Sequence, residues 1–478
     1  MERLCTAVSE KTIDIPTLDE ISKSLDGKLL RRQEIPLDTN TINRLLENQF
    51  IQAKPSIRKT PLTNQCMRCD NRDKLYFAKI PCACCNKTHL YCRKCIQMGR
   101  IMECEPLYFW NGPKVKWLVH EDPCSWEGEL TTAQKTASDQ IKRAIMERKQ
   151  DFLVWAVTGA GKTEMLFSGV SFALKMGMRI CIATPRSDVV RELKPRFEQA
   201  FETVSIEAVY GGSEDKKANA QLMLATTHQM LRFQEAFDII IIDEIDAFPF
   251  HADSSLQYAT NRAKKNSSTV IYLTATPRKQ QQVQIKNGKL AHVFVPTRYH
   301  GYPLPVPKLK MTYSLVKELK QYNAPRTFLS WLSKRENPQR QILIFVPTII
   351  LAQKLKSSLT QQLLEKNIIN TQTELEAVHS EDPMREEKVM AFRNKKLKVI
   401  LTTTILERGV TFPSVDVAIL DAGHVVFDEA ALVQIAGRAG RSGADPTGEV
   451  IFFHDGKTEA MLQAKHSIRV MNKRGGFN

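Results

Sequence analysis

The sequence predicts an α/β protein with two tandem domains, each a parallel sheet with helices on both faces, preceded by a small cysteine-rich module. Three observations lead to this prediction. Short apolar runs alternate with helical patterns over residues 129–296, a second alternating set fills residues 341–478, and nine of the eleven cysteines lie between Cys66 and Cys124. Alternation of strands and helices is typical of parallel sheets, because each helix carries the chain back across a face of the sheet.

The chain divides into five predicted segments. Residues 1–60 form an N-terminal region to which the sequence assigns no role, and residues 61–128 form the cysteine-rich module. Residues 129–296 are the first α/β domain, 297–340 a linker and basic segment, and 341–478 the second α/β domain. The linker assignment rests on four prolines that interrupt any regular element: Pro296, Pro303, Pro305 and Pro307.

The charge of the chain indicates a polyanionic partner. Its formal net charge is +16, and nine Lys or Arg against two acidic residues lie between Pro296 and Arg340. Such an excess favours nucleic acid or an anionic membrane face. No apolar run is long enough to span a bilayer, and the first residues, Met1–Cys5, lack the apolar core of a secretory signal. We therefore expect a cytoplasmic protein, with at most a peripheral position on the cytoplasmic face of the membrane.

Three C-x-x-C pairs define the cysteine-rich module: Cys66/Cys69, Cys82/Cys85 and Cys92/Cys95. In a cytoplasmic protein such pairs indicate a metal site rather than disulfides. Two pairs supply four thiolates at a spacing that suits tetrahedral Zn²⁺, and a closed shell of four sulfurs favours a structural role. We favour the first and third pairs as the ligands, because the second pair is crowded by an additional cysteine. The residues His89, Cys104 and Cys124 remain candidate ligands of a second site.

The segment after the apolar run Phe152–Trp155 has the pattern of a phosphate-binding loop. In such a loop a strand is followed by a Gly-rich turn and then by the start of a helix. The backbone N–H groups of the turn and the N-terminus of the helix bind phosphate oxygens. Lys162 would reach the β- and γ-phosphates, and the Thr163 hydroxyl would ligate Mg²⁺. The sequence therefore predicts that a nucleoside triphosphate contacts six consecutive residues: Thr158, Gly159, Ala160, Gly161, Lys162 and Thr163.

Acidic residues follow the apolar run Ile239–Ile242. In open parallel sheets, ligands bind beyond the carboxyl ends of the strands, so Asp243 is expected to hold the Mg²⁺ that Thr163 also touches. Glu244 is expected to orient or deprotonate the water that attacks the γ-phosphate. The segment Thr274–Pro277 ends the next apolar run with two hydroxyls that are suited to hydrogen-bond the acidic cluster.

The second α/β domain lacks a Gly-Lys-Thr loop and carries instead the pattern Gln434–Arg441. Arg438 and Arg441 stand three residues apart, so both can project from one helical face. Two guanidinium groups aimed across a cleft would neutralise the charge that develops on the γ-phosphate, as an arginine finger does. The predicted catalytic residues are Lys162, Asp243, Glu244, Gln434, Arg438 and Arg441.

Together, these motifs resemble a superfamily 2 helicase motor over residues 130–455. The resemblance implies two RecA-like domains that hydrolyse ATP in the cleft between them, with Gln134 reading the adenine edge. It also implies that a nucleic-acid backbone runs along three short segments, whose residues are Thr184, Pro185 and Arg186; Thr226, Thr227 and His228; and Thr403 and Thr404.

The chain as a whole resembles the ComFA family of late-competence DNA-uptake ATPases. The residues that carry this resemblance are Tyr91–Cys95 and Asp243–Phe250, together with the position of the cysteine module before the motor. The family implies an ATP-driven motor, with Mg²⁺ and Zn²⁺, that acts on single-stranded DNA as it enters a Gram-positive cell. It also implies a place on the cytoplasmic side of the uptake channel, beside other competence proteins.

Two alternatives stay open. One is a duplex-unwinding DNA helicase of replication restart or repair. The primosomal helicase carries its cysteines inside the second motor half, whereas here no cysteine follows Cys181. The other is a non-enzymatic nucleic-acid-binding scaffold with a decayed motor, which the intact Lys162, Asp243, Glu244 and Arg441 argue against.

Overall fold

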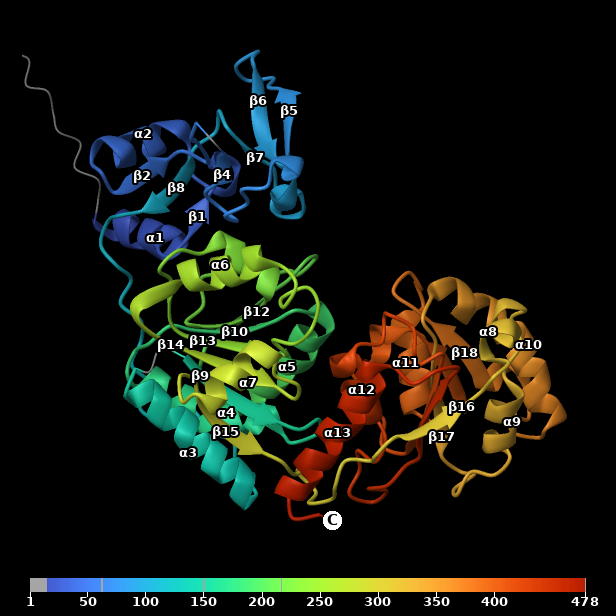
Figure 1. Cartoon of the computed structure of the whole chain (residues 1–478). Helices are drawn as coiled ribbons and strands as arrows, with labels where there is room; N and C mark the ends of the chain where they lie inside the picture. The colour runs from blue at the N-terminus through green and yellow to red at the C-terminus, as the bar shows by residue number, and fades with distance from the viewer. Residues whose placement is uncertain (1–14, 62, 149–150, 216, 478) are drawn as a thin grey trace, which may run out of the picture.

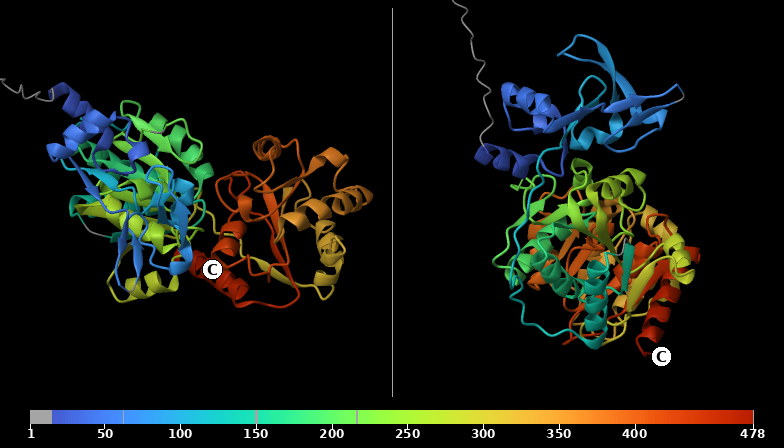
Figure 2. Two further views of the ribbon diagram at one scale, coloured as in Figure 1. Left: turned by 90° about the horizontal axis from the view of Figure 1, so that it is seen from above. Right: turned by 90° about the vertical axis from the view of Figure 1, so that its left-hand side faces the viewer.

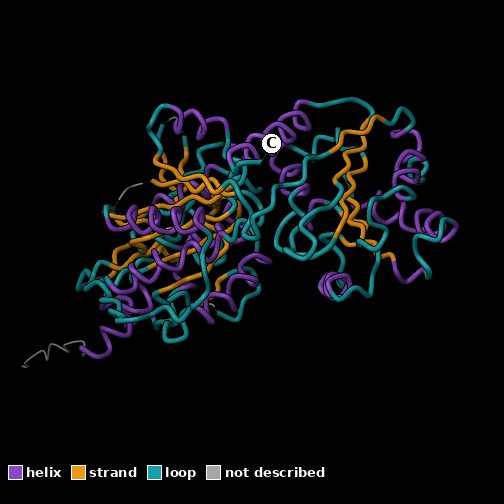
Figure 3. The backbone as a smooth tube through the Cα atoms, turned by 90° about the horizontal axis from the view of Figure 1, so that it is seen from below, coloured by secondary structure: helices purple, strands orange, loops and turns teal. Residues whose placement is uncertain are grey.

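A computed structural model describes residues 15–61, 63–148, 151–215 and 217–477. The chain folds into two α/β domains that lie side by side, and the N-terminal region is stacked on the first of them (Figure 1). Two further views show the same arrangement from above and from the side (Figure 2). Figure 3 shows strands gathered into sheets with helices around them. None of the helices in the described ranges has both the length and the apolar character needed to cross a membrane.

The first α/β domain has a seven-stranded sheet in the order β11-β12-β10-β13-β14-β9-β15, and all neighbouring strands are parallel. The strand β10 is buried along its whole length, as expected of a parallel strand covered on both faces. The strands are β9 (Asp151–Ala156), β10 (Ile180–Thr184), β11 (Ile206–Val209), β12 (Leu222–Thr226), β13 (Phe237–Asp243), β14 (Lys264–Thr274) and β15 (Ala291–Val295). The helices are α3 (Thr132–Met146), α4 (Lys162–Lys175), α5 (Ser187–Ala200), α6 (Ser254–Ala263) and α7 (Lys279–Lys286).

The strand order of this sheet brings three separate sequence motifs to one edge. Strands β9 and β13 both pair with β14, and all three run in the same direction. The Gly loop follows β9, while β13 ends at Asp243 and β14 ends at Thr274. Because the carboxyl ends of parallel strands meet at the same edge of a sheet, the Gly loop, the acidic residues and the threonines become neighbours.

The second α/β domain has a six-stranded sheet in the order β16-β21-β20-β17-β19-β18, again with parallel neighbours. The strands are β16 (Lys308–Met311), β17 (Gln341–Phe345), β18 (Leu375–Val378), β19 (Val399–Thr402), β20 (Val415–Leu420) and β21 (Val450–His454). The helices are α8 (Leu315–Lys320), α9 (Arg326–Leu332), α10 (Ile349–Glu365), α11 (Arg385–Arg393), α12 (Glu429–Ala436) and α13 (Glu459–Arg474).

The segment 297–340 is not a linker throughout, which corrects the prediction from sequence. Its residues from Lys308 onward belong to the second α/β domain: β16 pairs with β21, and the α9 rings of Phe328 and Trp331 lie 5.6 and 6.0 Å from the ring of Phe453 in β21. The strand β16 has the sequence Lys-Leu-Lys-Met, lies at the sheet edge and is partly exposed. A short edge strand rich in lysine produces no apolar run, so the sequence pattern does not reveal it.

The N-terminal region and the cysteine-rich module form one folded unit, so the predicted boundary at residue 60 is also corrected. Strand β8 (Leu107–Trp110) pairs antiparallel with both β1 (Leu29–Leu30) and β2 (Ile51–Lys54). Residues from both sides of the predicted boundary therefore share one sheet. The other α-helices and strands of the unit are α1 (Ile15–Leu25), α2 (Thr39–Glu47), β3 (Ile57–Lys59), β4 (Asn64–Cys66), β5 (Phe77–Pro81), β6 (Thr88–Cys92) and β7 (Ile101–Met102).

Candidate active site and metal centre

One cavity lies between the two α/β domains and is lined by both. The first domain contributes the Gly loop, residues 158–163, and the second contributes the end of α12 and the turn after it. The lining includes every residue predicted to be catalytic: Lys162, Asp243, Glu244, Gln434, Arg438 and Arg441. The structure therefore brings together the two walls of the predicted nucleotide site.

The Gly loop has the backbone shape that a phosphate-binding turn needs. Gly159 and Gly161 have φ angles of +78° and +70°, in the left-handed region that residues with a Cβ rarely adopt. Helix α4 begins directly after Gly161. Its first N–H groups have no partner within the helix, and the helix dipole is positive at this end, so an anion placed at the loop would be stabilised.

Gln134 supports this loop from behind. Its Nε2 donates to the Ala160 carbonyl at 2.9 Å, and its Oε1 accepts from the Thr131 backbone N–H at 2.8 Å. A Cβ at Gly161 would lie only 2.3 Å from Gln134 Nε2. Both ends of the Gln134 amide are thus bonded within the protein, and the side chain lies outside the cavity lining. The residue therefore holds the loop in place, and its contact with adenine stays a prediction.

Lys162 and the acidic pair meet inside the cavity. Lys162 Nζ lies 3.4 Å from Asp243 Oδ1. Burial raises the pKa of Asp243; Lys162 opposes this shift and Glu244 adds to it. A bound Mg²⁺ would favour the charged carboxylate, because hard cations prefer oxygen ligands, and the Thr163 hydroxyl lines the same cavity. The residues present therefore fit the predicted metal.

The predicted hydrogen bonds between the threonines and the acidic cluster are confirmed. Thr274 Oγ1 donates to Asp246 Oδ1 at 2.7 Å, and Thr276 Oγ1 donates to Asp246 Oδ2 at 2.8 Å. Asp246 is buried, as are both threonines. The turn after β14 is therefore tied to the acidic segment after β13, so a movement of one would shift the other.

Arg408 completes the acidic cluster from the second domain, and the sequence assigned it no role. Its Nη2 lies 2.7 Å from Asp246 Oδ2 and its Nη1 lies 3.4 Å from Glu244 Oε2. The side chains of Arg408 and Asp246 are each only 1% exposed. Burial alone would raise the pKa of Asp246, but Arg408 and the two threonine hydroxyls hold it well below its usual range. A buried ion pair thus joins the two domains beside the cavity.

Arg298, in the predicted linker, is a second residue that the sequence missed. Its guanidinium donates to the Gly437 carbonyl at 3.3 Å and to the Gly440 carbonyl, and a Cβ at Gly159 would lie 3.7 Å from its Cγ. Burial lowers the pKa of Arg298 to about 9. The side chain therefore packs between the Gly loop and the turn that carries the predicted arginine fingers.

The two predicted arginine fingers are held by backbone carbonyls. Arg438 donates from Nε to the Glu407 carbonyl at 3.0 Å and from Nη1 to the Val410 carbonyl, and Arg441 Nε donates to the Gly437 carbonyl at 3.0 Å. Burial lowers the pKa of Arg438, and the neighbouring charge of Arg441 lowers it further. Two guanidinium groups brought this close in a cavity fit a polyanionic ligand, whose charge would offset the repulsion between them.

Two buried polar atoms also indicate a ligand in the cavity. Thr158 Oγ1 and Gln434 Nε2 have no hydrogen-bond partner among the described residues, and both residues line the cavity. Buried polar atoms are nearly always hydrogen-bonded, so a polar ligand that contacts them is expected. The cavity therefore fits a nucleoside triphosphate by its charge and by its unpaired hydrogen-bonding groups.

Most residues predicted to contact nucleic acid have buried side chains, and their contact with nucleic acid stays a prediction. Five of the eight side chains are buried: Thr184, Pro185, Thr226, Thr227 and Thr403. Arg186 donates to the Ile405 carbonyl of the second domain at 2.6 Å, so its guanidinium joins the domains. Only His228 and Thr404 are partly exposed without such a role. Thr184 and Thr226 are the last residues of β10 and β12, strands in which every residue is buried.

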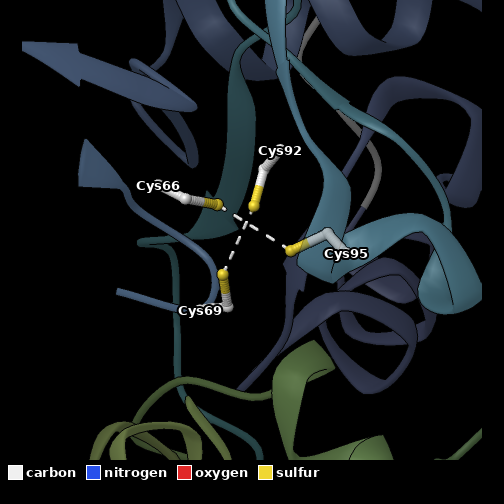
Figure 4. A group of neighbouring side chains, drawn as sticks. All are labelled: Cys66, Cys69, Cys92 and Cys95. Carbon is white, nitrogen blue, oxygen red and sulfur yellow. Dashed lines mark hydrogen bonds between the residues drawn. The ribbon is translucent and has the colours of Figure 1, made fainter. Parts of the chain in front are cut away.

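Four sulfurs converge in the N-terminal unit. The Sγ atoms of Cys66, Cys69, Cys92 and Cys95 all lie within 4.8 Å of one another, and all four residues are buried (Figure 4). The separations are 3.8 Å between Cys66 and Cys95 and 3.6 Å between Cys69 and Cys92. With Zn–S bonds of about 2.3 Å, a tetrahedral S₄ site has sulfur–sulfur separations of about 3.8 Å. The four residues fit Zn²⁺, and they are the two pairs favoured from the sequence.

Two arginines connect this metal centre to the first α/β domain. Arg262 of α6 donates to the carbonyl of Arg68, inside the first C-x-x-C pair, and to the Leu231 carbonyl at 2.7 Å. Arg68 is fully buried and donates from Nη1 to the Met98 carbonyl at 2.9 Å. The backbone of the metal-binding turn is therefore part of the interface with the first α/β domain.

Loss of the metal centre is expected to destabilise the N-terminal unit. The variant Cys66→Ser, Cys69→Ser should lose about one zinc ion per chain, and the midpoint of thermal unfolding should fall by more than about 5 °C, because structural zinc contributes directly to folding. Elemental analysis and calorimetry measure the two effects. Cys84→Ser, at an exposed cysteine outside this cluster, is the matched control. Unchanged zinc content in the double variant would contradict the assignment.

Comparison with known proteins covers nearly the whole chain. Residues 15–109 match the competence protein ComFA N-terminal domain, residues 127–279 the type III restriction enzyme res subunit, and residues 322–443 the helicase conserved C-terminal domain. Competence protein ComFA of Bacillus subtilis (strain 168) is 41% identical over 455 residues, which cover 95% of each chain. Competence protein ComFA of Streptococcus pneumoniae (strain ATCC BAA-255 / R6) is 35% identical over 434 residues, covering 90% of this chain and 95% of the relative.

Solved structures show the same fold in the two α/β domains. The DEAD-box helicase Mss116 bound to ssRNA and UDP-BeF matches with a TM-score of 0.51 at 15% identity, over 73% of this chain and 83% of that chain. A variant of S. cerevisiae Dbp5 bound to RNA and ADP BeF3 matches with a TM-score of 0.50 at 16% identity, over 74% and 94%. The predicted fold of two tandem RecA-like domains is confirmed.

Proposed function

Because this chain belongs to the competence protein ComFA family, we propose that it is an ATP-driven motor that moves along single-stranded DNA during the uptake of transforming DNA. Family membership and the helicase domains make it a competence-associated, helicase-like ATPase. The observation that carries the finer proposal is the cavity in which Lys162 of one α/β domain and Arg441 of the other line the same space. A nucleotide bound there would touch both domains at once.

The cavity residues would act on different parts of ATP. The Gly-loop N–H groups and Lys162 would hold the β- and γ-phosphates. Mg²⁺, when held by Thr163 and Asp243, supplies positive charge that offsets the charge of the phosphate oxygens. Glu244 would orient the attacking water and accept its proton. The guanidinium groups of the second domain would stabilise the charge that develops as the γ-phosphate is transferred to water.

Contacts across the cleft would couple hydrolysis to movement. Arg385 Nη2 of the second domain lies 2.8 Å from Asp188 Oδ1 of the first. The ion pair between Arg408 and Asp246 also joins the two domains, beside the cavity. Loss of the γ-phosphate would remove the anion that draws the arginine fingers toward the Gly loop, so the cleft would open. Repeated closure and opening would advance a strand that both domains hold.

The partners proposed here follow from charge and from the family. The net charge of +16 suits a polyanion such as single-stranded DNA. Membership in the family supports a place beside other competence proteins at the uptake channel, on the cytoplasmic face of the membrane. Cell fractionation tests this position, because a high-salt wash should release the protein from the membrane fraction if the association is peripheral and electrostatic.

Replacing Lys162 with alanine is expected to abolish most ATP turnover, by about 10²-fold or more, since the lysine is the cation that contacts the transferred phosphate. Turnover by the wild type should be stimulated more by single-stranded DNA than by duplex DNA or RNA. Lys175→Ala, at the exposed end of the same helix, is the matched control and should turn over ATP normally.

Three results of this assay would contradict the proposal. Near-zero turnover by the wild type with every nucleic acid would favour the non-enzymatic scaffold. Equal stimulation by duplex and single strands, together with strand separation on a tailed duplex, would favour the duplex-unwinding helicase. If Lys162→Ala and Lys175→Ala turn over ATP at similar rates, ATP is not hydrolysed in this cavity.

A further inference from the structure

A second group of sulfurs lies outside the metal centre described above. The Sγ atoms of Cys82, Cys85 and Cys104 all lie within 4.8 Å of one another, and Cys82 and Cys104 are 3.6 Å apart. This separation is close to the edge of about 3.8 Å expected of a tetrahedral zinc site and far from the length of a disulfide bond. Cys82 and Cys85 belong to the turn between β5 and β6, and Cys104 follows β7.

The turn at Cys82 has the same backbone geometry as the turn at Cys66. In the first metal centre, the Cys66 N–H donates to the Asn71 carbonyl at 3.0 Å, and the Asp70 N–H donates to the Cys66 carbonyl at 2.9 Å. At the second turn, the Cys82 N–H donates to the Lys87 carbonyl and the Asn86 N–H donates to the Cys82 carbonyl, both at 2.9 Å.

The backbone conformation of the two turns matches as well. The residue directly after the second cysteine of each pair has a left-handed backbone conformation, with a φ of 57° at Asp70 and 53° at Asn86. Such a turn directs two sulfurs of a C-x-x-C pair toward one point, which is how short cysteine turns hold zinc. The second pair is therefore shaped like a metal-binding turn, although the sequence suggested that it was the less regular one.

His89 lies next to this group, and a carboxylate lies on the side of its second ring nitrogen. Its Nε2 is 3.1 Å from Cys85 Sγ, and its Nδ1 lies 3.9 Å from Glu103 Oε2. Glu103 is fixed in turn, because it accepts from the Leu90 N–H at 3.1 Å and pairs with Lys59 Nζ at 2.5 Å. Metal-binding histidines commonly direct their second nitrogen toward a carboxylate, which leaves the first nitrogen free to bind the metal.

The pairing of β6 with β7 brings the segment that carries Cys104 close to His89. Strands β6 and β7 pair antiparallel, with Tyr91 opposite Met102, and the Glu103 N–H donates to the Leu90 carbonyl at 2.9 Å beyond the last paired residue. Cys104 follows Glu103 directly in the turn after β7, and His89 precedes Leu90 in β6. The contact between Glu103 and Leu90 therefore brings the segment that carries Cys104 close to the segment that carries His89.

We propose that Cys82, Cys85 and Cys104, with His89 as the fourth donor, bind a second zinc ion. Three thiolates and one imidazole form one of the common structural zinc sites, and soft sulfur ligands select zinc over Mg²⁺ or Ca²⁺. The site would join the tip of the β5–β6 hairpin to the segment after β7, and Figure 1 shows this hairpin projecting from the body of the molecule.

The small sheet formed by β5, β6 and β7 gives a physical reason for such a site. Within these strands only Cys92 and Ile101 are buried. A short sheet with so little buried apolar surface is marginal by itself, and small folds of this kind are commonly held by a metal or by disulfides. Zinc at the hairpin tip would supply the stability that the missing apolar core does not.

Metal content of the full-length chain tests the proposal. Wild-type protein purified with zinc present should contain about two zinc ions per chain, and Cys82→Ser, Cys104→Ser should contain about one. Cys84→Ser is the matched control, because this exposed cysteine lies in the same turn but outside the three-sulfur group, and it should keep the wild-type content. About one zinc in the wild type, or an unchanged content in the double variant, would overturn the proposal.

A second measurement does not depend on losing the metal. In His89→Ala the three thiolates remain, so Co²⁺ substituted into the site should still bind but its visible absorption should change, because water replaces the imidazole. Cys66→Ser, Cys69→Ser isolates this signal by removing the first site. An absorption spectrum unaffected by His89→Ala would overturn the assignment of histidine, and absence of any cobalt–thiolate absorption that depends on Cys82 would overturn the site. Neither readout depends on ATP hydrolysis or on DNA.

Discussion

Replacing Arg441 with alanine is expected to lower kcat for ATP hydrolysis by about 10³-fold or more, the range observed when an arginine finger is removed. Arg441 lines the cavity from the domain opposite the Gly loop, and its Nε is anchored on the Gly437 carbonyl at 3.0 Å. The anchor fixes the guanidinium near the point where charge develops. Steady-state turnover with single-stranded DNA present measures the loss.

Binding of nucleotide should survive this change, because the Gly loop and Lys162 remain. A fluorescent ATP analogue should therefore bind with an affinity within about tenfold of the wild type, which corresponds to about 1.4 kcal/mol. Arg469→Ala, at an exposed arginine of α13, is the matched control for loss of a positive charge from the same domain. Equal turnover by the two variants would show that hydrolysis does not use the second domain.

The nucleotide site could be predicted from the sequence because its parts are local patterns with a fixed place in a parallel sheet. A Gly loop after one strand and Asp243 after another both lie at carboxyl ends, and these ends share one edge. Arg408 could not be found in this way. Its partner Asp246 is 162 residues away in the chain, and no local pattern states which of several carboxylates an arginine will meet.

The exposure of the residues predicted to contact nucleic acid could not be derived from the sequence. The threonines were assigned by resemblance at the ends of strands, but strands such as β10 and β12 are buried on every residue. Backbone position alone does not decide whether a side chain points to solvent. The domain boundary at residue 60 failed because antiparallel pairing of β1 and β2 with β8 joins segments that are far apart in sequence, and short strands carry a weak pattern.

The second large effect is expected at Arg408. Replacing it with alanine leaves Asp246 buried and without its cation, and removal of one partner of a buried pair typically costs about 3–5 kcal/mol. The pair joins the two domains across the cleft. Its loss therefore destabilises the closed arrangement of the domains, in which ATP is hydrolysed. We expect turnover to fall about 10²–10³-fold, while ATP binding to the separate first domain changes little. Turnover and nucleotide affinity, measured on the same preparation, separate the two effects.

Arg385→Ala is the matched control, since Arg385 also pairs with a carboxylate across the cleft but both partners are partly exposed. Exposed pairs contribute about 0–1 kcal/mol, so this variant should lose less than about tenfold. The double variant Arg408→Ala, Asp246→Asn removes the unpaired charge and should recover stability, because the amide can still bond the two threonines. It should not recover turnover, because the link between the domains is still absent. Full recovery of turnover in the double variant would mean that the ion pair serves stability alone, and the cleft would then have to transmit hydrolysis through other contacts.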